Sequence, residues 1–199
     1  MDLTTTRADG GGLWVVGLVA STGGLDALAQ VLAPLPADFP GAVVALRHVH
    51  PEHPSHLAEI LDRRTALFVQ PARDGDRLQP GLVLVAPPGR HTLVCPDHTI
   101  ALINSGQTPP SRPSADLLLT SMALSCRERA VAVVLSGAGH DGTVGAAAVK
   151  RLGGLVLAQD RATSTEFGMP GSAIAFDEIV DRVLALARIG PVLKETVSA

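Results

Sequence analysis

The sequence predicts an α/β fold in three layers: a doubly wound, mostly parallel sheet with helices on both faces and a small antiparallel hairpin. Three observations lead to this prediction. Short apolar runs rich in Val, Leu and Ala recur along the 199 residues, as expected of strands buried on both faces. Segments of roughly ten to fifteen residues with helical spacing separate many of these runs. Gly, Pro and small polar residues mark most of the boundaries between them.

The expected elements follow one another along a single domain that covers residues 13–190, between a flexible N-terminal tail at 1–12 and a C-terminal tail at 191–199. Strands are expected at residues 13–20, 41–48, 67–72, 81–88, 130–136 and 155–160, and a hairpin at 91–103 with its turn near Pro96-Asp97. Helices are expected at residues 25–35, 53–65, 115–130, 143–154 and 177–189. Residues 103–114 and 162–173 have the composition of loops.

The composition excludes several classes of protein. Apolar residues make up 46% of the chain and charged residues 18%, so the chain can bury a core and is not a disordered protein. A net charge of −3 and few aromatic residues do not suggest a nucleic-acid surface. The longest uncharged stretch, residues 10–25, is 16 residues long and holds six glycines, so we expect no membrane insertion. Cys95 and Cys126 form no CxxC pair, and no signal peptide is evident, which favours a cytoplasmic protein.

Ser21 follows the first expected strand, within Ala20-Ser21-Thr22-Gly23-Gly24. A serine at a turn from strand to helix is exposed, and the first N–H groups of the helix can stabilise an oxyanion beside it. The glycines permit a tight turn and a close approach of substrate. The ordinary alternative is that Ser21 or Thr22 only caps the helix.

Two further side chains of the same chemistry follow strands. His48 ends the second expected strand, and Asp141 lies in the glycine-rich turn after the strand at 130–136. Because the carboxyl ends of parallel strands meet at one edge of a sheet, Ser21, His48 and Asp141 can act there as nucleophile, general base and orienting acid. Taken singly, the histidine is also compatible with an exposed loop, and the aspartate with a helix N-terminus.

Two other functions compete for the same residues. GAGHDG fits G-x-G-x-x-G between a strand and a helix, and Asp160 closes the next strand, as in dinucleotide-binding domains. Against this, Asp141 would face the pyrophosphate with a like charge. His48-Val49-His50-Pro51-Glu52-His53, with His56 beyond it, resembles a zinc motif, but Glu52 stands where that motif has Asp. That motif belongs to the metallo-β-lactamase-like hydrolases, whose two-sheet fold lacks the helix–strand alternation of this chain. We therefore expect no metal and no cofactor.

Taken together, the segments resemble the catalytic domain of chemotaxis receptor methylesterases, the CheB family. ASTGG after the first strand, a strand that ends in a single His, and SGAGHDG carry the resemblance. ARDGDRLQPGLVLVAPPGRH, SRPSADLLLTSMA and LAQDRATSTEFGMPGSAI agree as well, in the order that the family has them. The resemblance extends from about residue 15 to 183.

The resemblance implies hydrolysis of glutamate γ-methyl esters on the cytoplasmic helices of chemoreceptors and, in some members, deamidation of receptor glutamines. It assigns Ser21 as the nucleophile, His48 as the base and Asp141 as the orienting acid. Backbone N–H groups near Thr22 and the Ala138–Gly139 turn would hold the oxyanion. Arg112 would contact the substrate or brace the rim of the site.

The sequence also departs from the family. Members often read Q-H-M-P around the base, where this chain reads Arg47-His48-Val49-His50, and their G-M-G is Gly137-Ala138-Gly139 here. Members usually carry an N-terminal receiver domain, whereas about a dozen residues precede the first strand here. The expectation is either a constitutively open enzyme or regulation by a separate response-regulator receiver protein. A non-catalytic, receptor-binding module stays an alternative.

Overall fold

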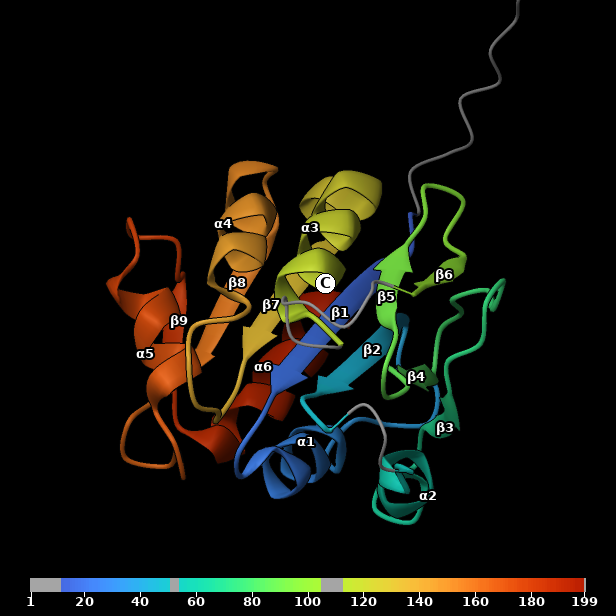
Figure 1. The fold of residues 1–199 in the computed structure, drawn as a ribbon, viewed down its shortest axis with the longest axis horizontal. Coiled ribbons are helices and arrows are strands. Elements are labelled where there is room, and N and C mark those ends of the chain that lie inside the picture. The colour runs from blue at the N-terminus through green and yellow to red at the C-terminus, as the bar shows by residue number, and fades with distance from the viewer. Residues whose placement is uncertain (1–11, 51–53, 105–112, 199) are drawn as a thin grey trace, which may run out of the picture.

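A central parallel sheet organises the protein. The computed structural model describes residues 12–50, 54–104 and 113–198 (Figure 1). Within them, seven strands pair in the order β3-β4-β2-β1-β7-β8-β9, and every pairing is parallel. The strands are β1 Trp14–Ala20, β2 Gly41–Arg47, β3 Phe68–Pro71, β4 Leu82–Val85, β7 Ala130–Val134, β8 Leu155–Gln159 and β9 Arg182–Leu184.

Helices cover both faces of the sheet, which confirms the predicted fold class (Figure 1). One layer contains α3 Ala115–Cys126, α4 Thr143–Arg151 and α5 Gly168–Ala175; the other contains α1 Gly24–Leu32, α2 Leu57–Asp62 and α6 Leu186–Ser198. A short 3₁₀ helix, Arg127–Arg129, follows α3. The predicted hairpin is present as β5 His91–Val94 and β6 Ile100–Ile103, paired antiparallel. It is fixed to α3 by hydrogen bonds between Val94 and the side chains of Ser121 and Ser125.

The central strand β1 explains why the sequence shows apolar runs rather than alternation. Val16 and Leu18 pack on the side of α1 and α6, while Val15 and Val19 pack on the side of α3 and α4. All four side chains are fully buried. Since β1 lies between two strands and two helix layers, every position along it demands an apolar residue.

The strand order reverses at β1. Outward from β1, the sheet contains β2, β4 and β3 on one side and β7, β8 and β9 on the other, although β3 precedes β4 in the chain. The carboxyl ends of β2, β1 and β7 therefore lie next to one another where the two halves of the sheet diverge. Ligand sites of doubly wound sheets form at such a point, because loops leave it in opposite directions and open a crevice.

The C-terminal part of the sequence prediction is wrong. The helix expected at 177–189 is instead the edge strand β9 followed by α6, because Val183 and Leu184 pair with β8. The segment 162–173, expected as a loop, contains the start of α5. Helical spacing of a few apolar residues cannot reveal a three-residue edge strand, since its pairing partner lies elsewhere in the chain.

The predicted C-terminal tail is wrong as well. Residues 191–198 belong to α6, and Val192, Leu193 and Val197 are buried against the sheet. The sequence predicts a helix that ends before Gly190-Pro191, but Gly190 lies within α6 and packs against the end of α1. A Cβ there would lie 2.4 Å from Pro34 Cγ, so the glycine lets α6 approach the end of α1. Of the expected N-terminal tail, residues 1–11 lie outside the described residues.

We predict that Gly145→Ala destabilises the fold. Gly145 lies where α4 crosses α3, and a Cβ there would meet Leu119 Cβ at 2.6 Å and the Asp116 carbonyl oxygen at 2.8 Å. Because one contact is backbone, the two helices must separate. We expect the free energy of unfolding, measured by urea denaturation, to fall by about 1–3 kcal/mol. Val144→Ala, at an exposed position of the same helix, should change it by less than about 0.5 kcal/mol.

Candidate active site

Ser21 lies in the turn that joins β1 to α1. Its backbone N–H donates to the Ser136 carbonyl at 2.9 Å, so the turn is fixed to the strand end of β7. The N-cap of α1 is Gly23, with φ of +76°, and no side chain caps the helix. The alternative in which Ser21 or Thr22 serves as the cap is therefore wrong. Gly23 occupies the N-cap position in the left-handed conformation, and the Ser21 hydroxyl makes no capping hydrogen bond to α1.

His48 directly follows β2, the strand that pairs with β1. Its N–H donates to the Ala20 carbonyl at 3.0 Å and so extends the pairing of β1 with β2 by one residue. This places His48 beside the turn that holds Ser21. Both residues line one hollow of about 360 Å³, together with Thr22, Gly23, Arg47, Val49, His50 and Pro54.

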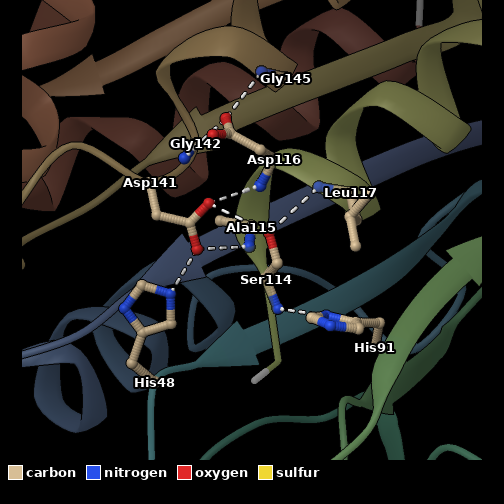
Figure 2. Close-up of polar contacts among 9 residues, drawn as sticks. All are labelled: His48, His91, Ser114, Ala115, Asp116, Leu117, Asp141, Gly142 and Gly145. Carbon is tan, nitrogen blue, oxygen red and sulfur yellow. Dashed lines mark hydrogen bonds and ion pairs between the residues drawn. The ribbon is translucent and has the colours of Figure 1, made fainter. Parts of the chain in front are cut away.

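Asp141 lies in the loop between β7 and α4 and faces both His48 and the N-terminus of α3 (Figure 2). His48 Nε2 lies 2.8 Å from Asp141 Oδ2. The backbone N–H groups of Ala115 and Asp116 donate to the same carboxylate at 2.8 and 2.9 Å, and the Ser114 hydroxyl donates at 3.2 Å. With Nε2 directed at the aspartate, Nδ1 is the nitrogen of His48 that remains for another partner.

A second aspartate completes a reciprocal arrangement. Asp116, in the first turn of α3, accepts the N–H groups of Gly142 and Gly145 at the start of α4, at 2.9 and 2.8 Å. Each aspartate thus binds the N-terminus of the helix that carries or follows the other one (Figure 2). Carboxylates are favoured at helix N-termini, so the two contacts stabilise each other's geometry.

The two carboxylates differ in their protonation equilibria. Burial opposes ionisation of Asp141, but hydrogen bonds from His48 and from the N–H groups of Asp116 and Ala115 outweigh it and lower its pKa. Burial raises the pKa of Asp116, with the charge of Asp141 acting in the same direction against the bonds from Gly145 and Gly142. Asp141 is therefore held as the ionised partner of His48.

A buried polar network formed by Ser136 and Gln159 also fixes the turn that contains Ser21. The Ser136 hydroxyl donates to the Thr22 carbonyl at 2.8 Å and accepts the Glu166 N–H at 3.0 Å. The Ser136 N–H donates to Gln159 Oε1 at 2.8 Å, and the Gln159 amide donates to the Thr163 carbonyl at 2.8 Å. Ser136 and Gln159 are almost completely buried. Because both groups are satisfied, the network is rigid and holds the turn in one place.

The remaining residues predicted for the site lie close to Ser21 or outside the described part of the chain. Thr22, Ala138 and Gly139 are exposed around the turn of Ser21, and their role in holding an oxyanion stays a prediction. Gly137 packs directly against Ser21, since a Cβ on it would lie 2.8 Å from Ser21 Cβ. Arg112 lies outside the described residues.

The structure favours neither of the two competing functions, dinucleotide binding at GAGHDG and metal binding at the histidine-rich segment. A pyrophosphate would need the N-terminal N–H groups of α4, but the Asp116 carboxylate accepts those of Gly142 and Gly145. Among the residues that the structure describes, no group of three or more His, Cys, Asp or Glu could hold a metal ion. His56 contacts Glu59 at 3.8 Å, and His53 lies outside the described residues. In the same described part, no helix is long and apolar enough to span a membrane.

Comparison with known proteins identifies the family of this chain. The sequence profile described as CheB methylesterase matches residues 16–193, which is most of the chain. The chain belongs to the CheB methylesterase family. The crystal structure of the Thermotoga maritima CheB methylesterase catalytic domain superposes with a TM-score of 0.87 at 34% sequence identity. The superposition covers 93% of this chain and 99% of that one.

Curated relatives carry the name protein-glutamate methylesterase/protein-glutamine glutaminase. That of Maricaulis maris is 39% identical over 89% of this chain, and the second such protein of Pseudomonas aeruginosa is 41% identical over 90%. The first such protein of Myxococcus xanthus is 43% identical over 90%. The match covers 45%, 52% and 52% of these relatives, so the chain spans about half of their length.

Sequence reasoning missed the residues that hold the site together. Asp116, Ser136 and Gln159 touch the segments of Ser21 and Asp141 but carried no assigned role. Ser114 followed by Asp116 is a recognisable helix start, so the capping pattern could have drawn attention to the N-terminus of α3. Nothing local marks Ser136 or Gln159, because their partners lie 23 or more residues away or in the bend after β8.

We predict that Asp141→Asn lowers stability in a pH-dependent way. The folded pKa of Asp141 lies below its ordinary value of 3.8, so its ionisation stabilises the fold above that pH and ceases to do so as the pH falls through the folded value. At pH 7 the variant should lose about 1–3 kcal/mol of unfolding free energy. The difference from wild type should shrink below pH 3.8 in urea titrations. A difference that stayed constant with pH would contradict this account.

We predict that Ser136→Ala impairs the turn of Ser21 without unfolding the protein. The change removes the bond to the Thr22 carbonyl and leaves the Glu166 N–H without its acceptor. We expect Ser21 to react with a serine-directed fluorophosphonate about tenfold more slowly, measured as a labelling rate. Ser125→Ala is the matched control, because it removes one hydrogen bond to the Val94 carbonyl away from the site. Equal labelling rates in both variants would show that the network does not position Ser21.

Proposed function

We propose that this protein is a serine hydrolase that removes methyl esters from glutamate side chains of chemoreceptor-type signalling proteins. The observation that carries the proposal is the bond between His48 and Asp141 at the carboxyl edge of the sheet, with Ser21 in the same hollow. The names of the relatives and the 34% identity to a CheB catalytic domain support this substrate class.

In the proposed mechanism, Ser21 Oγ attacks the ester carbonyl while His48 Nδ1 takes its proton. Asp141 keeps the imidazole oriented through Nε2 and stabilises its charged form. N–H groups near Thr22 and the Ala138–Gly139 turn stabilise the oxyanion. His48 then donates its proton to the leaving methoxide, methanol departs, and water releases the glutamate by the reverse proton transfers.

The same groups would deamidate glutamine, with ammonia leaving in place of methanol. The glutaminase part of the relatives' names supports this second reaction. Action on the receptor's cytoplasmic helices would place the enzyme in the cytoplasm. A separate receiver protein remains a candidate regulator, and its binding would be seen as a change in the rate of ester hydrolysis.

The decisive experiment measures methanol release from a methylated chemoreceptor cytoplasmic fragment. We expect wild type to release methanol, and Ser21→Ala to be slower by at least about 10³-fold because the acyl-enzyme cannot form. Asp141→Asn should lose about 10³–10⁴-fold through misorientation of His48. Ser125→Ala should retain the wild-type rate.

Three outcomes would redirect the assignment. Release that a chelator abolishes and that survives in Ser21→Ala would indicate metal-dependent hydrolysis at the histidine-rich segment. Binding of the receptor fragment without release, and without labelling of Ser21 by a fluorophosphonate, would indicate the non-catalytic binding module. Tight binding of a nicotinamide dinucleotide would support the dinucleotide function of GAGHDG.

A further inference from the structure

Arg47 brings a positive charge to the hollow that holds Ser21 and His48. It is the last residue of β2 and is half-buried. Its aliphatic stem packs over the first residue of α1, since a Cβ on Gly24 would lie 3.3 Å from Arg47 Cγ and 3.5 Å from Arg47 Cδ. The stem of the side chain is thus held between the carboxyl end of β2 and the N-terminus of α1, and Arg47 lines the hollow.

This guanidinium group has no partner among the described residues. Its Nε is buried and makes no hydrogen bond, and no ion pair involves Arg47. A buried donor without an acceptor is costly, and more so when the donor belongs to a cation. The other described residues that line the hollow are Ser21, Thr22, Gly23, His48, Val49, His50 and Pro54, and none of them is an acid. The N-terminus of α1 adds a partial charge of the same sign.

The described lining of this part of the hollow therefore favours an anionic ligand. A glutamyl methyl ester is neutral, so Arg47 does not match the reacting group of the proposed substrate. A second side chain of that substrate would match it. The planar fork of a guanidinium pairs best with a carboxylate, and an acidic side chain on the same face of a substrate helix can reach a neighbouring site.

We propose that Arg47 forms a carboxylate-binding subsite that recognises an acidic side chain of the protein substrate beside the glutamyl methyl ester. This inference rests on the proposed function. The subsite makes the enzyme prefer esters with an acidic neighbour. Each turnover converts an ester into a carboxylate, so hydrolysis at one position makes an adjacent ester a better substrate. The resemblance to the CheB family places an amide at this position in many members, whereas this chain has Arg47.

The test compares two helical peptides that each carry one glutamyl methyl ester. They differ only in whether the positions three and four residues from the ester hold Glu or Gln. We expect wild type to have a kcat/KM about tenfold higher on the Glu peptide. In Arg47→Gln, which restores the amide of the family, that ratio should fall to near one. Arg188→Gln removes the same charge from an exposed position of α6 and should keep the wild-type ratio.

The alternatives give different results. An equal kcat/KM on both peptides in wild type, or an unchanged ratio in Arg47→Gln, overturns the subsite. A loss by the same factor on both peptides also overturns it, because Arg47 would then act on the oxyanion or on the fold. If Arg47→Gln does not fold, the wild-type ratio still decides: it should fall when NaCl rises from about 0.05 to 0.5 M, and a constant ratio overturns the subsite. Methanol release from neither peptide would instead refute the proposed function.

Discussion

The carboxylate of Asp141 is the group on which the rest of the site depends. It accepts hydrogen bonds from the imidazole of His48 and from the first N–H groups of α3, so a single side chain joins β2, α3 and the loop before α4. Asp116 returns the same interaction to α4. Two helix N-termini are thus held by two exchanged carboxylates, and the cost of burying a second negative charge falls on Asp116, whose pKa is raised. This arrangement keeps Asp141 charged and oriented, which is what the proposed base requires.

The parallel sheet supplies the second constraint. Ser21, His48 and Asp141 are separated by 27 and 93 residues in sequence, yet they follow the neighbouring strands β1, β2 and β7. Each strand is held by buried side chains on both faces, so the points from which the loops leave the strands are fixed relative to one another. The turn of Ser21 is additionally fixed by Ser136 and Gln159. A site built on rigid strand ends in this way keeps reacting groups in register, and tolerates variation in the loops around them.

Two of the differences from the family that the sequence shows, Arg47 and Ala138, lie close to this rigid centre. Arg47 and Ala138 alter charge and volume beside Ser21, while the bond between His48 and Asp141 does not involve either of them. Substrate preference can change at such positions without change to the proposed chemistry. This separation follows from the geometry: the orienting bond lies at the N-terminus of α3, whereas Arg47 lines the hollow and Ala138 lies in the loop after β7.

The sequence by itself determined the fold class, most of the strands and helices, and the three residues proposed for catalysis. Buried strands such as β1 can be predicted because both of their faces require apolar residues. The motifs at the strand ends can be recognised because each one lies within a few consecutive residues. Only the tertiary structure decided the C-terminal order of β9 and α6, since a short edge strand depends on its neighbour β8 and Gly190 is explained by contact with Pro34. Likewise, only the tertiary structure disclosed the roles of Asp116, Ser136 and Gln159, and a guanidinium of Arg47 that has no partner among the described residues. The roles of these residues depend on contacts with groups that are distant in the sequence, and such contacts cannot be predicted from spacing along the chain.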